Sequence, residues 1–455
     1  MDFKQIYTPG LAHCSYILGG ENGCIVIDPA RDVQVYLDAA LGYQLPIIAI
    51  LETHLHADFV SGHIELAERT GATIYMSKTA NALFDHHALV DGEEWQIDSF
   101  HIKMLDTPGH TPDCSIFLVA DTLRGPEYVL AFTGDTLLIG DAGRPDLFPM
   151  MKNQLATQLY HSLRKIEAYG DHIEIYPAHG AGSLCGKALS SKLSSTLGTE
   201  RMHNDAMKLH PLEAFVDSFL QDMPEAPDHF SRCSEMNRLG PANTQNLEKP
   251  MALKPEEFKE EMRAGAIVVD TRDLLPFASA HIPHAFGLSL RGNFATFAGW
   301  VLPPDPTILL IVDSEKDVAI ACKGLYSVGL DRVKGYLRSG MNGFAMKGYR
   351  TSRLTSISVE ELREKLERKE ITLVDTRLKS EWDTFHILGS IHMPAPDVRT
   401  RANEIPVNKP VAFICNSGNR SLLAASLFLQ KRSDIEVMNV LGGTSVWNAL
   451  GYPIE

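Results

Sequence analysis

The chain has 455 residues, of which 44% are hydrophobic and 22% charged, so it is long enough for several globular domains with sizeable cores. Its formal charge of −15, without a local basic patch, argues against nucleic-acid binding and favours small-molecule chemistry. No apolar run approaches the ~18 residues of a membrane span, and the seven scattered cysteines include no CxxC pair, so we expect a cytoplasmic protein without a membrane segment.

The first element that carries chemistry is a predicted buried strand at residues 47–51, which leads directly into a histidine-rich loop. Within this loop, His54, His56 and Asp58 occupy alternate positions. An extended or tight-loop conformation would turn these side chains to one side, where they can meet a shared metal ion. The pattern alone is only moderately specific.

Three further candidate ligands follow, each after a predicted strand. They are His110 in a Pro-Gly-His sequence, Asp135 in Thr-Gly-Asp, and His179 in Pro-Ala-His. One lone histidine is usually a turn residue satisfied by backbone hydrogen bonds. The ordered set at successive strand ends instead predicts a metal site, because loops at strand ends are where sites are built.

The order HxHxD, PGH, TGD, PAH resembles the metallo-β-lactamase superfamily over about residues 1–245. This resemblance implies two sheets sandwiched between helices, with the metal at one edge of the sandwich. Two-metal hydrolases of the superfamily have a further histidine where this chain has Phe59, which cannot bind a metal. Only Asp58, His179 and a shared Asp135 would remain for a second ion, so one metal ion is expected.

A site made of His54, His110 and Asp135 offers two imidazoles and one carboxylate, with open positions for other ligands. Such a set is associated with non-haem iron(II) oxygen chemistry. Imidazole also suits zinc, so the ligand types alone leave the metal open.

A closer resemblance rests on residues 56–63 (HADFVSGH), 140–147 (GDAGRPDL) and 177–186 (PAHGAGSLCG), which resemble persulfide dioxygenases, particularly those fused to rhodanese domains. It implies one Fe(II) per chain on His54, His110 and Asp135. The implied reaction is oxidation of a low-molecular-weight thiol persulfide by dioxygen to sulfite and thiol. No motif indicates whether the carrier thiol is glutathione, coenzyme A or another.

Four neighbours of the predicted site have two interpretations each. His56 orients a ligand or substrate, or else is a fourth ligand. Asp58 is expected to hydrogen-bond a histidine rather than bind a second metal. Arg144 either pairs with Asp146 as a frame for the pocket or contacts substrate. Cys185 is either a thiol that accepts or relays sulfur, as its match in the fused dioxygenases suggests, or a packing residue.

An internal repeat occupies the C-terminal part of the chain. Residues 268–272 (VVDTR) followed by His281 recur as residues 373–377 (LVDTR) followed by His386, with the same spacing. Short β-branched runs alternate with helical patterns in both copies, which predicts parallel α/β units. The proline-rich, polar stretch 225–254 is interpreted as a linker. The expected domains are therefore 1–248, 249–352 and 353–455.

In the last copy, a predicted strand at 411–414 leads to Cys415 and then to a helical run at 422–430. Backbone N–H groups and the helix dipole at such a loop favour the thiolate, and Arg420 adds a cation for an anionic substrate. Gly418 allows the loop to curl around the sulfur. The remaining loop residues are Asn416, Ser417, Asn419 and Ser421. Cysteine phosphatase loops are one residue longer between cysteine and arginine, so the tighter loop suits a persulfide sulfur or thiosulfate.

Together with its DTR and HIxGS elements, this copy resembles rhodanese over about residues 355–455. The resemblance implies that Cys415 carries sulfane sulfur, either to sulfite to give thiosulfate or in the reverse direction. Asp375 and Arg377 would then be structural. The middle copy has Asp313 at the position of the cysteine, and this acidic residue would repel an anion. It is expected to be an inactive rhodanese used for architecture or docking.

The combined prediction is an enzyme for sulfide detoxification or sulfur metabolism that oxidises a persulfide and transfers sulfane sulfur. One alternative is a zinc-dependent thioester hydrolase of the glyoxalase II type with an attached sulfurtransferase, which Phe59 argues against. Another is a non-catalytic sulfur-binding sensor or scaffold. The resemblance also allows a homo-oligomer.

Overall fold

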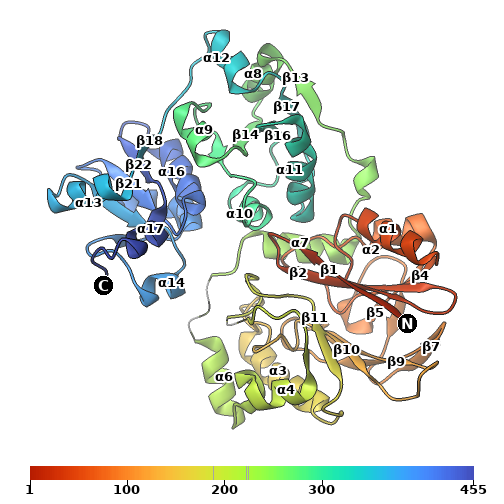
Figure 1. Ribbon diagram of the computed structural model, residues 1–455. Helices are drawn as coiled ribbons and strands as arrows, with labels where there is room; N and C mark the ends of the chain where they lie inside the picture. The colour runs from red at the N-terminus through yellow and green to blue at the C-terminus, as the bar shows by residue number, and fades with distance from the viewer. Residues whose placement is uncertain (188, 222, 224) are drawn as a thin grey trace. The chain divides into compact units, whose positions relative to one another are not determined.

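The computed structural model describes residues 1–455 except positions 188, 222 and 224 (Figure 1). The chain divides into two compact units. The first comprises Met1–Asn246 with the short segment Tyr326–Gly329, and the second comprises Leu247–Leu325 with Leu330–Glu455. Within the described residues, no helix combines the length and the apolar character that crossing a lipid bilayer requires.

The first unit contains two six-stranded sheets. Sheet one has the order β1-β2-β3-β4-β5-β6, antiparallel from β1 to β3 and parallel from β3 onwards. Its strands are β1 (Asp2–Thr8), β2 (His13–Gly19), β3 (Cys24–Ile27), β4 (Ile47–Leu51), β5 (Thr73–Ser77) and β6 (His87–Leu89). Sheet two has the order β12-β11-β10-β9-β8-β7. Its strands are β7 (Glu94–Ile97), β8 (Phe100–Asp106), β9 (Ser115–Asp121), β10 (Leu130–Gly134), β11 (Glu174–Pro177) and β12 (Ser195–Thr196).

Apolar side chains on the facing sides of the two sheets form one core, in which Tyr16 and Leu51 meet Phe117 and Phe132. The outer face of sheet one is covered by α1 and α2, and that of sheet two by α3 and the helices after β12 (Figure 1). The helices of this unit are α1 (Gln34–Tyr43), α2 (His63–Thr70), α3 (Lys152–Ile166), α4 (Leu197–His203), α5 (Asp205–Lys208), α6 (Leu212–Leu220) and α7 (His229–Leu239), with short 3₁₀ turns η1 (Lys78–Ala80) and η2 (Thr244–Asn246). This arrangement confirms the predicted αββα sandwich.

The predicted linker at 225–254 contains regular structure, because α7 (His229–Leu239) lies within it. The Asn237 side chain is buried and its Nδ2 donates to the carbonyl oxygens of His56 and Phe59, both at 2.8 Å. The polar composition that suggested a linker therefore includes a side chain that fixes the histidine-rich loop. Composition alone does not distinguish a buried polar anchor from a solvated one.

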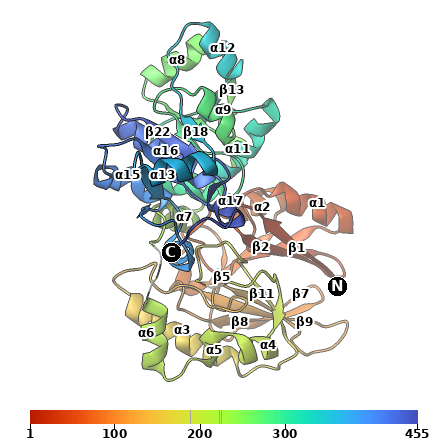
Figure 2. The same ribbon diagram turned by 60° about the vertical axis from the view of Figure 1, so that its left-hand side comes forward.

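The second unit contains two five-stranded sheets, both entirely parallel (Figure 2). Their orders, β13-β17-β16-β14-β15 and β18-β22-β21-β19-β20, correspond strand by strand, so the sequence repeat is a repeat of structure. The first sheet has β13 (Met251–Leu253), β14 (Ile267–Asp270), β15 (Phe286–Gly287), β16 (Ile308–Ile311) and β17 (Val333–Leu337). The second has β18 (Thr355–Ile357), β19 (Thr372–Asp375), β20 (Ile391–His392), β21 (Val411–Ile414) and β22 (Val437–Val440).

Helices connect the parallel strands in both repeats, as crossover connections require. The middle repeat has α8 (Pro255–Arg263), α9 (Leu274–Ser279), α10 (Phe294–Val301), α11 (Glu315–Ser327) and α12 (Gly340–Met346). The last repeat has α13 (Val359–Glu367), α14 (Lys379–Thr384), η3 (Ala395–Asp397), α15 (Val398–Arg401), η4 (Ala402–Glu404), α16 (Asn419–Lys431) and α17 (Gly443–Ala449). The Ser358–Glu361 capping box predicted for α13 is present. The predicted α/β class is confirmed for this unit.

The Asp-Thr-Arg element of each repeat is a buried ion pair. In the last repeat, Arg377 Nη2 lies 2.6 Å from Asp375 Oδ2, and the two side chains are 2% and 0% exposed. Arg377 also donates to the carbonyl oxygen of Phe385 at 2.8 Å. The pair Arg272–Asp270 repeats this geometry. These contacts support the structural role expected for Asp375 and Arg377.

Replacing Arg377 should therefore destabilise the last repeat strongly. In Arg377→Met, the buried Asp375 carboxylate loses its partner, which costs about 3–5 kcal/mol. Hydrogen exchange of the β19 and β21 peptides, read by mass spectrometry, would measure this loss. Arg368→Met, which removes an exposed pair with Glu364, should leave the exchange nearly unchanged. Equal exchange in the two variants would contradict the structural role.

Candidate functional site

Four strand ends of the first unit carry the predicted ligands to one edge of the sandwich. His54 follows β4, His110 follows β8, Asp135 directly follows β10, and His179 follows β11. All four side chains are buried. One ligand atom from each of His54, His110 and Asp135 lies within 4.8 Å of the other two. His110 Nε2 lies 3.3 Å from Asp135 Oδ2, which is close enough for a charge contact.

The hydrogen bonds of the two imidazoles fix their tautomers. His110 Nδ1 lies 2.9 Å from the carbonyl oxygen of Arg144, which can only accept, so Nδ1 carries the proton. His54 Nδ1 lies 3.0 Å from Thr53 Oγ1. Because Thr53 Oγ1 donates its own proton to Asp28 Oδ2 at 2.9 Å, it accepts from His54. Both rings therefore direct an unprotonated Nε2 toward Asp135.

Those two Nε2 atoms are buried and have no hydrogen-bond partner among the described residues. A buried polar atom without a partner is costly, and a metal ion would satisfy both atoms at once. Burial lowers the pKa of His54 and of His110, which keeps both imidazoles neutral. Two neutral imidazoles beside a carboxylate form a donor set that fits one transition-metal ion.

The glycine of the Thr-Gly-Asp sequence is required by this geometry. Gly134 has φ +52°, in the left-handed region, and a Cβ there would lie 2.6 Å from Thr53 Oγ1. Thr53 orients His54, so a side chain at position 134 would displace a predicted ligand as well as strain the backbone. Glycine is therefore needed in this motif because the end of β10 closely approaches the loop after β4.

His179 links two carboxylates beside the three predicted ligands. Its Nδ1 lies 2.8 and 2.9 Å from the two oxygens of Asp135, and its Nε2 lies 2.9 Å from Asp58 Oδ2. Burial opposes protonation, but Asp135 and Asp58 outweigh it and raise the pKa of His179 well above its ordinary value. An imidazolium here would orient Asp135 toward the two unprotonated nitrogens. With Cys185, Asp58 and His179 form a second close group of potential ligands.

His56 enters a third group. Its Nε2 lies 3.3 Å from Asp28 Oδ1 and 3.7 Å from Glu52 Oε2, and all three side chains are buried. The alternating residues of the HxHxD loop are therefore distributed among three neighbouring groups instead of facing a single point. The spacing predicted that the three side chains would turn to one side, as they would in an extended strand. This loop is not an extended strand, so its side chains do not alternate strictly.

Sequence reasoning missed Asp28, Glu52 and His13. Asp28 follows the apolar strand β3 and Glu52 precedes the first histidine of the motif, so their strand-end positions were a usable signal. His13 lies inside β2, where no motif marks it. Its ring centroid is 4.1 Å from that of Phe59, and both of its buried ring nitrogens lack a hydrogen-bond partner among the described residues.

Arg144 and Cys185 lie beside the site. Arg144 is 1% exposed and forms a bidentate pair with Asp146, with Nε and Nη2 each 2.7 Å from a carboxylate oxygen. This geometry favours the framing interpretation over substrate contact. Cys185 is buried against Ala57 and Phe230. Burial, reinforced by Asp58 and Asp135, raises the pKa of the Cys185 thiol well above its ordinary value, so the thiol stays protonated.

The loop after β21 wraps around the Cys415 sulfur in the second unit. Gly418 N donates to Cys415 Sγ at 3.1 Å, and Ser421 Oγ donates to the same atom at 3.4 Å. Gly418 has φ +119°, which allows its amide to turn inward. Asn416 is held from α17, because Ser445 Oγ donates to its Oδ1 at 2.6 Å. Two hydrogen-bond donors therefore point at the sulfur, and Ser417 and Asn419 complete the loop.

Arg420 lies in an ion pair that sequence reasoning did not include. Its Nη2 donates to Glu381 Oε1 at 2.8 Å, and its Nη1 donates to Oε2 of the same carboxylate. Burial raises the pKa of Glu381, but the bonds from Arg420 outweigh burial and the net shift is downward. The cation at the loop is therefore largely neutralised by α14.

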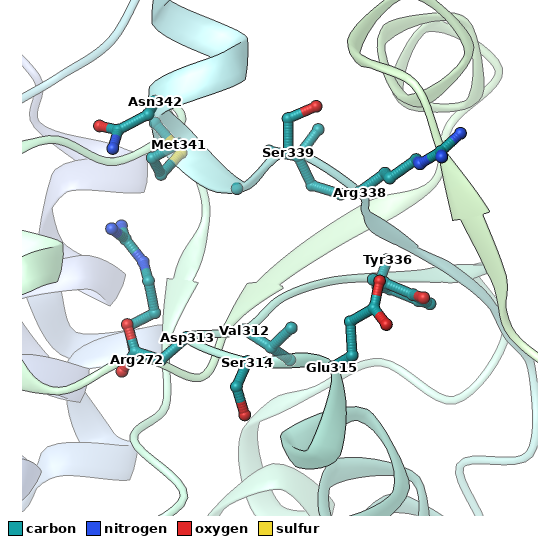
Figure 3. Close-up of a pocket in the computed structure, with 12 residues that line it drawn as sticks. Arg272, Val312, Asp313, Ser314, Glu315, Tyr336, Arg338, Ser339, Met341 and Asn342 are labelled. Carbon is teal, nitrogen blue, oxygen red and sulfur yellow. The ribbon is translucent and has the colours of Figure 1, made fainter.

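A cavity of about 440 Å³ occupies the corresponding place in the middle repeat (Figure 3). Asp313 and Ser314 line it at the end of β16, and Arg272 also lines it. Ser314 donates both its N–H and its Oγ–H to Asp317 Oδ2, each at 2.9 Å. The amide end that would receive an anion is satisfied by the protein's own carboxylate.

The fold and the two sites define a metallo-β-lactamase-fold protein with a rhodanese-like domain at its C-terminal end. Residues 8–179 match the metallo-beta-lactamase superfamily and residues 358–450 match the rhodanese-like domain. The mitochondrial persulfide dioxygenase ETHE1 of Bos taurus is 33% identical over 185 residues, which cover 39% of this chain and 67% of that protein. A hydroxyacylglutathione hydrolase of Methylococcus capsulatus is 34% identical over 169 residues, covering 35% of this chain and 58% of that protein.

Among solved structures, a metallo-beta-lactamase from Staphylococcus aureus subsp. aureus COL is 31% identical, with a TM-score of 0.67. The match covers 74% of this chain and 98% of that one, so it extends beyond the first unit. The chain belongs to the persulfide dioxygenase–rhodanese fusions of the metallo-β-lactamase superfamily.

Proposed function

We propose that domain 1–248 is an Fe(II)-dependent persulfide dioxygenase and that domain 353–455 is a sulfurtransferase with Cys415 as its sulfur carrier, joined by the inactive domain 249–352. The observation that carries the first assignment is the pair of buried, unprotonated Nε2 atoms of His54 and His110 directed at Asp135. Membership of the fusion family supports the substrate class, a low-molecular-weight thiol persulfide of the glutathione or coenzyme A type.

His54, His110 and Asp135 would hold one iron ion per chain. When bound, Fe(II) would supply the open positions at which dioxygen and the terminal sulfur react, giving sulfite and free thiol from persulfide, dioxygen and water. The chain's own residues prepare this site. Thr53 and the Arg144 carbonyl fix the imidazole tautomers, and His179 fixes Asp135. Phe59, buried where a further ligand would be needed, favours a single metal.

The sulfur-transfer step uses the Cys415 thiolate as nucleophile. It attacks the outer sulfur of a thiol persulfide, forming a Cys415 persulfide as the original S–S bond breaks and the carrier thiol leaves. Sulfite then attacks the outer sulfur, the Cys415 S–S bond breaks, and thiosulfate leaves while the thiolate is restored. Gly418 N–H and Ser421 O–H donate to the sulfur that carries the charge in each half. The reverse flow from thiosulfate uses the same groups.

The alternative is a zinc-dependent thioester hydrolase of the glyoxalase II type, for which the similarity to hydroxyacylglutathione hydrolases is the specific observation. Iron-reconstituted protein should form sulfite from glutathione persulfide only in air, and should not hydrolyse S-lactoylglutathione. Thioester hydrolysis under nitrogen, with no sulfite formed in air, would establish the hydrolase instead. Testing coenzyme A persulfide in the same assay would assign the carrier.

A further inference from the structure

The helix that begins at the sulfur-transfer loop, α16, packs against β15 of the middle domain, the repeat without a cysteine at the nucleophile position. Gly418, Leu422, Ser426 and Gln430 occur at every fourth position, so they lie along one side of α16. We call these four residues the α16 stripe. Each of them contacts a residue of the middle domain.

The contact nearest the chemistry joins the catalytic loop to α9. A Cβ placed on Gly418 would lie 3.2 Å from Leu274 Cδ2, so Leu274 packs directly against the backbone that donates to Cys415 Sγ. Beside it, a Cβ on Gly292 would lie 3.9 Å from Asn419 Nδ2. The middle domain therefore touches two consecutive residues of the loop.

Further along the stripe the contact becomes tighter and is fixed by hydrogen bonds. Gly287 N, at the end of β15, donates to Ser426 Oγ at 3.0 Å, and this bond is buried. A Cβ on Gly287 would lie 3.1 Å from Leu422 Cγ, so any larger residue there would require Leu422 to shift and the strand and the helix are closely packed at that point. Gln430 Nε2 donates to the carbonyl oxygen of His284 at 3.3 Å.

We propose that the middle domain is a working part of the sulfur-transfer site, with Leu274 as a positioning residue that holds the Gly418 amide against the Cys415 sulfur. The cysteine loop curls inward only because Gly418 adopts φ +119°, a conformation that nothing in its own side chain restrains. Leu274 closes the outer side of that turn, and β15 fixes the helix that follows it. This role rests on Cys415 being the sulfur carrier.

The proposal also accounts for the retention of a repeat that has lost its own nucleophile. Its cavity carries Asp313 at the nucleophile position, so the domain has no sulfur chemistry of its own to supply. The residues that reach the neighbouring loop lie elsewhere in the repeat, on α9, β15 and the segment before α10 (Phe294–Val301). Loss of the cysteine therefore leaves the contact with α16 untouched.

The test uses Leu274→Ala in the full-length chain, with Leu275→Ala as the matched control. Leu275 is the next residue of α9 and is 59% exposed, so its truncation removes the same atoms without touching the loop. The primary readout is the pH profile of Cys415 alkylation by iodoacetamide, followed on the Cys415 peptide by mass spectrometry. This readout requires no sulfurtransferase activity, so it fails or succeeds independently of the proposed function.

In Leu274→Ala, the midpoint of the alkylation profile should rise by about half a pH unit or more, because a looser Gly418 amide stabilises the thiolate less. In thiosulfate formation, kcat should fall by about tenfold with a smaller change in KM, since the loop acts on the reacting sulfur. Leu274→Met should show the alkylation midpoint and the kcat of the unmodified chain. A Leu274→Ala profile that overlays those of Leu275→Ala and the unmodified chain, with kcat unchanged, would overturn the proposal.

Discussion

Cys415→Ser is expected to abolish thiosulfate formation while persulfide-dependent oxygen uptake and sulfite release continue. The thiolate is the group that bonds to sulfur in both half-reactions, and loss of such a nucleophile typically costs a factor of about 10⁴ or more. Gly418 N–H and Ser421 O–H would then face a neutral hydroxyl instead of a sulfur anion. The measurement is parallel quantification of sulfite and thiosulfate from glutathione persulfide in air.

Cys322→Ser is the matched control, because Cys322 is a buried cysteine on α11 of the middle repeat and does not belong to the loop around Cys415. It should form both products at the rate of the unmodified chain. Loss of both sulfite and thiosulfate in Cys415→Ser would mean that the two activities are not separable. Thiosulfate formation that survives in Cys415→Ser would remove Cys415 from the reaction.

His110→Ala is expected to lose the metal and, with it, all oxygen uptake. Within the described residues, His110 supplies one of the two unprotonated imidazole nitrogens near Asp135. Changing a residue that merely orients a ligand costs about 10–100-fold in metal affinity, so loss of a direct ligand should cost at least about 100-fold. Metal analysis after purification, together with oxygen uptake after iron reconstitution, measures both effects.

The control for this substitution is His101→Ala, which removes an imidazole from β8, the same strand that leads to His110. His101 is partly exposed, and its Nε2 lies 3.2 Å from Glu94 Oε2. It therefore differs from His110, whose side chain is buried. Metal content should be unchanged in this variant. A His110→Ala protein that retains iron and oxygen uptake would show that the metal is held by one of the two neighbouring groups instead.

Much of the fold was predictable because its signals are local. Strong apolar runs marked β4 (Ile47–Leu51) and β21 (Val411–Ile414), and the duplicated Asp-Thr-Arg and histidine spacing marked the repeat. The buried Asp375–Arg377 pair explains why that element occurs twice, since each sheet needs it for the same structural purpose. The αββα sandwich as a whole was predicted from the resemblance to the metallo-β-lactamase superfamily.

What the sequence did not reveal are contacts between residues far apart in the chain. Asn237 fixes the histidine-rich loop from a segment that composition described as a linker. Glu381 pairs with Arg420 across 39 positions, so the loop cation is less available than its motif suggests. Asp28 reaches the site through Thr53. Each of these contacts depends on the tertiary structure, which neither the spacing of motifs nor the periodicity of the sequence predicts.

The most direct test of the central assignment is oxygen consumption by protein of known metal content, measured on addition of glutathione persulfide or coenzyme A persulfide. We expect about one iron per chain and rapid oxygen uptake, with one sulfite formed for each dioxygen consumed. Zinc at one or two ions per chain, with no oxygen uptake even after iron reconstitution, would contradict it. In that case the first domain would be a hydrolase, and only the assignment of Cys415 to sulfur transfer would stand.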